Sequence, residues 1–472
     1  MKLIDKEENE MLSVGIDIGT TTLQLVFSKI TVCNVSGSFS MPQIKITGKK
    51  IIYKSEIYFT PFNSFGNIDL QGIKNIITCE YRNAGINKED ITTGAIIITG
   101  ETAGKENAEE VLNALSEFAG DFVVATAGPD LEAILAGNGS GTSKISEQKS
   151  LRIMNFDVGG GTTNAAVFNN GVLKDSFALN IGGRLIRLDK DFKITYVSEK
   201  IQELIEYLNL DLYVGSEAKL DQLKKLTDDF AKIFIKIGKN ETLNKESNAL
   251  FISHGTGGLI PEGFTFSGGV AEFIYKDINL CEKKDIMMYG DIGPLLGYSI
   301  NEAFCKNILK ILEPKEKIRA TVIGAGSYSM AISGSTIIFE DEVLPIKNVP
   351  ILKLESIKNE IIEDDIINKV KMYQNSNIAL AFKGCKSPSY VQVKAIAEAI
   401  IKGLRGRNDP IIIIIENDFA KALGQTIKNM LNDSKTVICI DQIKVENGDY
   451  VDIGKSILGV LLVVIKTLIF KN

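Results

Sequence analysis

The sequence has no tryptophan and a single histidine, His254, in 472 residues. A serine–histidine hydrolase or a histidine-rich metal site would therefore have to depend on that one side chain. The six cysteines are scattered, and none lies within four residues of another. A cysteine-held iron–sulfur cluster or structural zinc site is not expected from such spacing. Scattered cysteines in a large chain indicate reduced core residues of a cytosolic protein instead.

The chain also lacks an excess of positive charge and a long hydrophobic run. Lys and Arg number 53 against 59 Asp and Glu, which gives a net charge of −6 and argues against nucleic acid as the main partner. The most apolar stretch, residues 457–465, is too short to span a bilayer, and its β-branched content predicts one buried strand. No signal peptide precedes the first apolar run. We therefore expect a cytoplasmic protein without a membrane partner.

The length predicts several structural units, at roughly 150 residues per domain. A glycine-rich segment that reads as a loop ends at residue 141, and the composition changes near residue 345, where prolines and then a charged run appear. The expected units are residues 1–145, 146–345 and 346–472. Short apolar strands alternate with amphipathic helices throughout, so the expected fold class is α/β. In the last unit, residues 411–415 and 437–440 flank a helical pattern and predict a βαβ unit.

One motif occurs twice. Residues 12–18 form an apolar run that ends in Asp17-Ile-Gly-Thr-Thr-Thr22, and a second apolar run follows. The same order returns 140 residues later around Asp157-Val-Gly-Gly-Gly-Thr-Thr-Asn164. A repeat at the scale of a domain indicates two related halves that face each other across a cleft.

The repeated turn has the chemistry of a phosphate site. Glycine lets backbone N–H groups approach an anion closely, and threonine adds hydroxyl donors. The aspartate of each turn would repel a phosphate unless a divalent cation lay between them, so Asp17 and Asp157 are the expected Mg²⁺ ligands, through water. The expected phosphate-binding residues are Gly19, Thr20, Thr21, Thr22, Gly159, Gly160, Gly161, Thr162 and Thr163.

Two further glycine-rich segments follow in the second unit. Residues 264–266 and 319–323 both read as apolar strands that end in glycine turns. These turns add Gly268 and Gly269, and then Gly324 and Gly326, to the expected nucleotide site. Residues 137–141 read as a loop at the boundary between the first two units.

These turns resemble the phosphate and adenosine motifs of the actin-like ATPase superfamily. That resemblance implies two duplicated ribonuclease-H-like domains around a nucleotide cleft, with ATP and Mg²⁺ bound between them. It also implies that a polar side chain near the crossover positions the attacking water. Glu101 is the residue expected in that role. Asp17 and Asp157 are expected to be catalytic as well.

Within the superfamily, the chain resembles the reactivating factors of ethanolamine ammonia-lyase from about residue 12 to residue 470. The resemblance rests on the combination of the two turns with further segments: Ala95–Glu101, Asn180–Leu185, Asp291–Leu296, Arg319–Gly326 and Gly448–Gly454. It implies an ATP-dependent protein that binds inactivated lyase and releases damaged cobalamin, so that intact cofactor can rebind. The expected partners are that lyase and ATP or ADP, and the C-terminal region is a candidate partner-binding unit.

Several alternatives stay open from the sequence. They are a small-molecule kinase, another chaperone-like ATPase of the same fold, and a filament-forming relative of actin. An electron-transferring activator of a radical dehydratase is disfavoured by the cysteine spacing. The sequence also leaves open a homo-oligomer and an association with a bacterial microcompartment.

Overall fold

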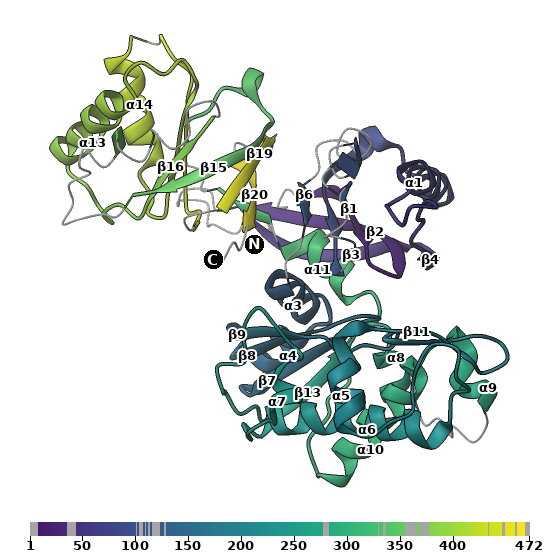
Figure 1. Ribbon diagram of the computed structural model, residues 1–472. Coiled ribbons are helices and arrows are strands. Elements are labelled where there is room, and N and C mark those ends of the chain that lie inside the picture. Colours follow the sequence, from purple (N-terminus) through teal and green to yellow (C-terminus); the bar gives the residue numbers. More distant parts are fainter. Residues whose placement is uncertain are drawn as a thin grey trace, which may run out of the picture.

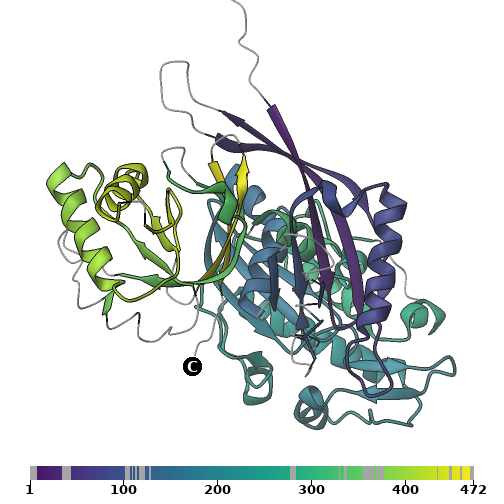
Figure 2. The same ribbon diagram turned by 90° about the horizontal axis from the view of Figure 1, so that it is seen from above.

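The computed structural model has three lobes, two of which face each other while the third lies beside the first (Figures 1 and 2). It describes residues 8–34, 44–100, 102, 107–108, 110–111, 114–115, 123–126, 129–276, 283–328, 330–333, 337–354, 366–367, 370, 377–432, 434–445, 449–457 and 460–467. The lobes correspond to three large hydrophobic clusters, one under each main sheet.

The first half is built on a sheet of order β3-β2-β1-β5-β6, with the short β4 paired to β2. Strands β1, β2 and β3 are antiparallel neighbours, whereas β5 runs parallel to β1. Helix α1 covers one face and buries Ile73, Ile77 and Tyr81. The elements are β1 (Glu8–Ile18), β2 (Thr22–Asn34), β3 (Ile44–Lys54), β4 (Tyr58–Phe59), α1 (Leu70–Ala84), η1 (Lys88–Asp90), β5 (Ile91–Ile98) and β6 (Val123–Thr126).

The second half has a sheet of order β12-β9-β8-β7-β13. Helix α6 packs its apolar stripe, including Leu223, Phe230 and Ile237, into the core, as its helical spacing predicts. The elements are β7 (Arg152–Val158), β8 (Thr163–Asn169), β9 (Val172–Leu179), β10 (Ile186–Leu188), β11 (Ile194–Val197), η3 (Glu199–Ile201), α5 (Gln202–Tyr207), α6 (Leu220–Gly238), α7 (Lys245–Asn248), β12 (Phe251–Ile252), β13 (Gly263–Ser267), α8 (Ala271–Ile274), α9 (Lys283–Ile286), η4 (Met287–Tyr289) and α10 (Gly293–Lys306).

The two sheets repeat one topology. In each, three consecutive strands form an antiparallel meander, and the strand that follows the helical insertion pairs parallel to the first. Strands β1, β2, β3 and β5 thus correspond to β7, β8, β9 and β13. The expected α/β fold with duplicated halves of the actin-like type is confirmed.

Two helices cross between the halves (Figure 1). Helix α3 (Pro129–Gly139), which α4 (Thr142–Lys149) follows, packs on the second sheet, and α11 (Ala320–Tyr328) packs on the first. A Cβ added to Gly139 would lie 1.8 Å from the Ala320 carbonyl oxygen, and one added to Gly324 would lie 2.0 Å from the Leu135 carbonyl oxygen. The helices approach this closely because both crossing positions lack a side chain.

Two sequence predictions fail at this crossing. Residues 137–139 were expected in a loop but end helix α3, and residues 320–323 were expected in a strand but begin helix α11. Small and β-branched residues in a short apolar run fit a strand and a buried helix equally well. At the crossing this segment is helical, because the small residues of α3 and α11 permit a close approach of the two helix backbones.

The C-terminal lobe has a seven-stranded sheet of order β14-β20-β19-β15-β16-β17-β18. Its β17-α14-β18 segment is parallel and confirms the expected βαβ unit. Residues 457–465, expected to form one strand, are instead divided between two, because Ile457 ends β19 and pairs antiparallel with Val460, which begins β20. The elements are β14 (Met330–Ile332), η5 (Asp341–Val343), β15 (Ile346–Lys353), β16 (Ala379–Phe382), α13 (Tyr390–Gly403), β17 (Ile411–Ile415), α14 (Ala420–Met430), β18 (Val437–Asp441), β19 (Asp449–Ile457) and β20 (Val460–Thr467). The division of the chain at residues 145 and 345 stays a prediction.

Within the described residues, no helix has the length and apolar character needed to cross a membrane.

The helix crossing generates a stability prediction. Replacement of Gly139 by alanine should lower the free energy of unfolding by about 3 kcal/mol, because the new methyl group overlaps the α11 backbone. Chemical denaturation measures this change. Gly255→Ala is the matched control, since a Cβ there meets nothing within 4 Å. Equal stability of the two variants would contradict the close crossing.

Candidate functional site

The two glycine–threonine turns are built in the same way. The Gly19 N–H donates to the Thr22 carbonyl oxygen at 2.9 Å, and the Gly159 N–H donates to the Thr162 carbonyl oxygen at the same distance. Each turn links the first two strands of its sheet, β1 to β2 and β7 to β8. The predicted repeat is therefore a repeat of local geometry as well as of sequence.

The fold brings the two turns into contact. A Cβ added to Gly160 would lie 2.9 Å from Thr21 Oγ1, so the second turn touches the threonines of the first. A Cβ added to Gly182 would lie 2.3 Å from the Gly160 carbonyl oxygen. The Arg184 N–H also donates to that oxygen at 2.7 Å. The segment around Gly182 thus supports the second turn from behind, and only glycine fits there.

Each aspartate is held by a hydroxyl group from the neighbouring parallel strand or the turn after it. Thr99 donates to Asp17 Oδ1 at 3.0 Å, directly after β5. Ser267, at the end of β13, donates to Asp157 Oδ1 at 2.6 Å. Thr321 of α11 donates to the other Asp157 oxygen at 3.3 Å. These contacts fix both carboxylates at the floor of the site, in equivalent positions of the two halves.

A third buried carboxyl group, that of Glu132, joins the two aspartates. Glu132 lies in the first turn of α3. Its Oε1 accepts from the Gly100 N–H of the first half at 2.7 Å, and its Oε2 accepts from Asn164 Nδ2 of the second half at 2.6 Å. Glu132 thus contacts both halves at the place where they meet.

The three carboxyl groups share one electrostatic environment. Burial raises the pKa of Asp17 to about 7, and the nearby charge of Asp157 adds to the rise. Burial also raises the pKa of Asp157 to about 6. The pKa of Glu132 rises to about 8 through burial and the charges of both aspartates. Three carboxylates this close and this buried are unfavourable together, and a cation between them relieves both the desolvation and the repulsion.

The donor set fits a hydrated divalent cation. Among the described residues, no group of three or more Asp, Glu, His or Cys side chains is arranged to hold a metal ion by itself. Mg²⁺ keeps several waters and takes few protein ligands when phosphate oxygens complete its shell. Asp17 and Asp157 therefore stay the proposed Mg²⁺ residues.

Of the other expected binding residues, Gly268 and Gly269 follow β13 in the same half as Asp157. Gly268 has φ +86°, and a Cβ there would lie 2.4 Å from the Val158 carbonyl oxygen. The backbone of this turn thus packs against the end of β7 beside the second phosphate turn. Gly324 and Gly326 lie in α11 rather than in a turn, and the contact of Gly324 with Leu135 gives it a packing role. A nucleotide contact for these four glycines stays a prediction.

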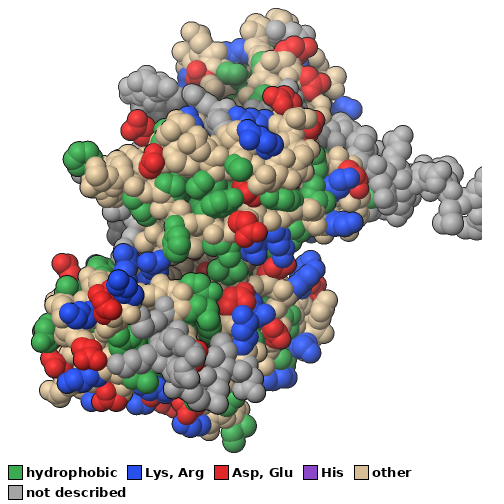
Figure 3. Space-filling view, turned by 90° about the vertical axis from the view of Figure 1, so that its right-hand side faces the viewer, with side chains coloured by type: hydrophobic (Ala, Val, Ile, Leu, Met, Phe, Trp, Pro, Cys, Tyr) green, Lys and Arg blue, Asp and Glu red, His purple; other side chains and the backbone are tan. Residues whose placement is uncertain are grey.

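Hydrophobic side chains lie on both sides of the furrow between the halves (Figure 3). Phe59 at the end of β4 is 73% exposed, and the guanidinium of Arg184 from the other half lies 5.9 Å from its ring centroid. Arg184 also faces the buried Asp291 at 3.8 Å. Asp291 in turn accepts from the Gly293 N–H at 2.9 Å, so its side chain caps the start of α10.

The expected water-positioning residue, Glu101, lies outside the described residues. Glu132 was missed, because its sequence context, a glutamate in the first turn of a helix, is common on any protein surface. Its burial depends on the approach of α3 to both turns, which no local pattern encodes.

Comparison with known proteins gives a consistent result. Residues 9–471 match the family described as "Ethanolamine utilisation protein EutA". A protein of Escherichia coli strain K12 named ethanolamine ammonia-lyase reactivase EutA is 34% identical over 481 residues, which cover 98% of this chain and 99% of the relative. The protein of the same name from Salmonella typhimurium is 32% identical over 478 residues, with the same coverage.

Solved structures are more distant. The Aquifex aeolicus member of the Ppx/GppA family is 13% identical with a TM-score of 0.42, over 67% of this chain and 97% of that chain. The ethanolamine utilization protein EutJ from Carboxydothermus hydrogenoformans is 15% identical with a TM-score of 0.32, over 67% and 89%. Likenesses at these scores do not bear on the function.

The buried aspartates generate a stability prediction. A raised pKa means that the folded state holds its proton more tightly than the unfolded chain, so the wild-type protein loses stability as the pH rises from 3.8 towards 7. Asp17→Asn removes this loss. In the absence of metal and nucleotide it should stabilise the protein by about 2 kcal/mol at pH 8 and by less at pH 5.5.

Thermal unfolding in a chelator at both pH values measures the effect. Asp221→Asn, which changes an exposed aspartate on α6, is the control and should show no such gain. Destabilisation by Asp17→Asn at pH 8 would contradict the electrostatic strain described for this site.

Proposed function

Because the chain belongs to the EutA family of ethanolamine-utilisation proteins, we propose that it is an ATP-dependent reactivase of ethanolamine ammonia-lyase. In this proposal it binds lyase that holds a damaged cobalamin, releases that cofactor and leaves the lyase ready for an intact one. The observation that carries the nucleotide part is the contact between two equivalent glycine–threonine turns, each with a buried aspartate behind it.

The proposed nucleotide site has donors on both sides and carboxylates at its floor. Backbone N–H groups and hydroxyls of Gly19 to Thr22 and of Gly159 to Thr163 suit the phosphate oxygens of ATP. When bound, Mg²⁺ would supply charge neutralisation between these phosphates and the two aspartates. The carboxylates then lose their mutual repulsion, so binding of the metal and the nucleotide is mutually dependent.

Glu132 is the proposed base for the attacking water. A general base works best with a pKa near the operating pH, and that of Glu132 is raised to about 8 by burial. The hydrogen bonds from Gly100 and Asn164 fix the orientation of the carboxyl group. A cation at the adjacent aspartates would lower the pKa of Glu132 again and so favour the ionised form that acts as the base.

The same geometry couples the nucleotide to movement of the halves. One turn belongs to each half, and Glu132 contacts both. ATP held by both turns favours the closed arrangement, and its conversion to ADP removes contacts that join them. Such a ligand shifts the population between closed and open states by its difference in affinity for the two. In this proposal the shift changes the affinity for the lyase, with the C-terminal lobe as candidate partner surface.

The role of Glu132 is testable. Glu132→Gln keeps the size and the acceptor for the Gly100 N–H, so ATP should still bind, whereas turnover should fall at least 100-fold because the base is lost. Nucleotide binding by calorimetry and phosphate release measure the two effects separately. Glu110→Gln, an exposed residue, is the control. Turnover within twofold of the wild-type rate would remove Glu132 from the mechanism.

The partner and the reaction need a second experiment. Ethanolamine ammonia-lyase loaded with a cobalamin that has lost its adenosyl group is mixed with this protein, ATP, Mg²⁺ and fresh adenosylcobalamin. Deamination of ethanolamine should return with the wild-type protein and stay absent with Asp157→Asn, which lacks a metal ligand. Phosphate release without recovered deamination would contradict the proposed partner. A phosphorylated small molecule would favour the kinase alternative.

A further inference from the structure

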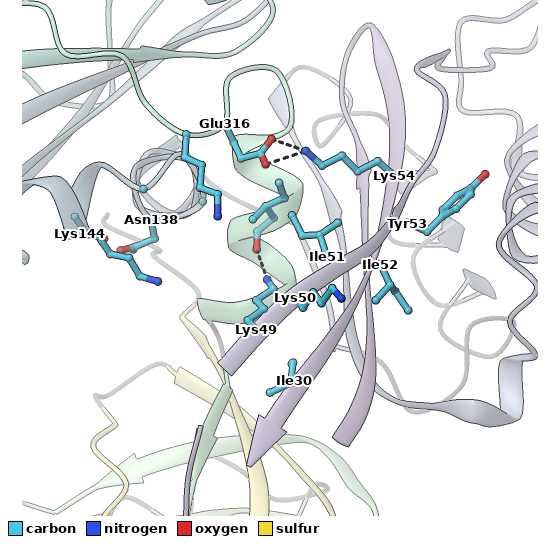
Figure 4. Close-up of a pocket in the computed structure, with 15 residues that line it drawn as sticks. Ile30, Lys49, Lys50, Ile51, Ile52, Tyr53, Lys54, Asn138, Lys144 and Glu316 are labelled. Atoms are coloured by element: carbon cyan, nitrogen blue, oxygen red, sulfur yellow. Dashed lines mark hydrogen bonds and ion pairs between the residues drawn. The ribbon is translucent and has the colours of Figure 1, made fainter. Parts of the chain in front are cut away.

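A cavity spans the two halves on residues that the proposed nucleotide site does not use. Its volume is about 780 Å³. One wall comes from β3 of the first half, and the opposite wall comes from the end of α3, the start of α4 and the segment before α11 (Figure 4). A cavity of this size matches those that hold small organic molecules.

The charge of the cavity is strongly one-sided. Five lysines line it, against one carboxylate, that of Glu316. Lys54 pairs with Glu316 at 2.8 Å. The structure shows no ion pair for Lys50, Lys144 or Lys315 within the ranges it describes. At least three cations therefore line the cavity without a protein anion to balance them.

Lys49 is the most enclosed of the five. Its Nζ donates to the Ile323 carbonyl oxygen of α11 at 2.9 Å, and Figure 4 shows Lys144 approaching it from the other half. Burial, together with repulsion from Lys144, lowers the pKa of Lys49 to about 8. The cavity thus already carries an electrostatic penalty, which an anion between these two lysines would remove.

Lysines on β3 alone have a simpler explanation. β3 is an edge strand of the first sheet, and lysines on such edges prevent pairing with other chains. That explanation does not cover Lys144 of α4 and Lys315 in the segment before α11, which belong to other elements and approach from the opposite wall. Lysines that approach one cavity from both halves are the arrangement expected of a site that binds an anion.

The cavity also has an apolar side. Ile51 and Ile323 line it beside the lysines, and both belong to a small buried cluster between β3 and α11. A ligand of matching chemistry has clustered anionic groups and a short carbon skeleton. We propose that this cavity binds a small organic polyanion, of the phosphate-ester or polycarboxylate class, that bridges the two halves.

Calorimetric titration with two probes tests the proposal at about 150 mM salt, where the general field of the protein is screened. The probes are inorganic tripolyphosphate and citrate, which separate phosphate from carboxylate recognition. The double variant Lys144→Gln/Lys315→Gln should bind at least one probe tenfold more weakly than wild type. Both lysines are exposed, so the fold is expected to persist, and thermal unfolding checks it.

The control is Lys200→Gln/Lys232→Gln, which removes two exposed lysines of the second half away from the cavity. It should change the affinity less than twofold. Because neither double variant alters the glycine–threonine turns, binding of tripolyphosphate at those turns contributes equally to both. Equal affinities of the two double variants for each probe, or no binding of either probe to the wild type, would overturn the proposal.

Discussion

The whole arrangement depends on the burial of three carboxyl groups at one point. Asp17, Asp157 and Glu132 lie where two chain turns meet, and burial raises the pKa of each. A fold gains nothing from such a cluster when it is empty, since each charge has lost its water and faces others of the same sign. Such a cluster supports the proposed Mg²⁺ position at Asp17 and Asp157, because a nearby cation would relieve both the desolvation and the repulsion.

The duplication of the two halves explains how one chain brings these buried carboxyl groups together. Each half supplies a meander, a turn and an aspartate, and each aspartate is fixed by a hydroxyl from the parallel strand that follows. The glycines of α3 and α11 let the helices cross at backbone contact, which sets the distance between the halves. The packing of α3 against α11 therefore determines how the two glycine–threonine turns lie relative to each other. The lysine-lined cavity lies at the edge of the same crossing, where Gly139 and Ile323 line it.

Features of the fold and the site that are local or repeated could be predicted from the sequence. The turns around Asp17 and Asp157 were predictable because strand, aspartate, glycine and threonine are consecutive, and the second copy excluded coincidence. The α6 stripe and the βαβ unit were predictable because periodicity encodes them directly. Glu132 was not predictable, since only the tertiary approach of α3 buries it. Residues 320–323 were misassigned because a short run of small and β-branched residues carries no helical period, and the crossing with α3 decides its form.

The most direct test of the central claim is a crystal structure with Mg²⁺ and a non-hydrolysable ATP analogue. We expect the phosphates between Gly19–Thr22 and Gly159–Thr163, with a hydrated cation beside Asp17 and Asp157 and the Glu132 carboxylate facing the terminal phosphate. A nucleotide bound elsewhere, or bound between the turns with no cation near the two aspartates, would contradict it.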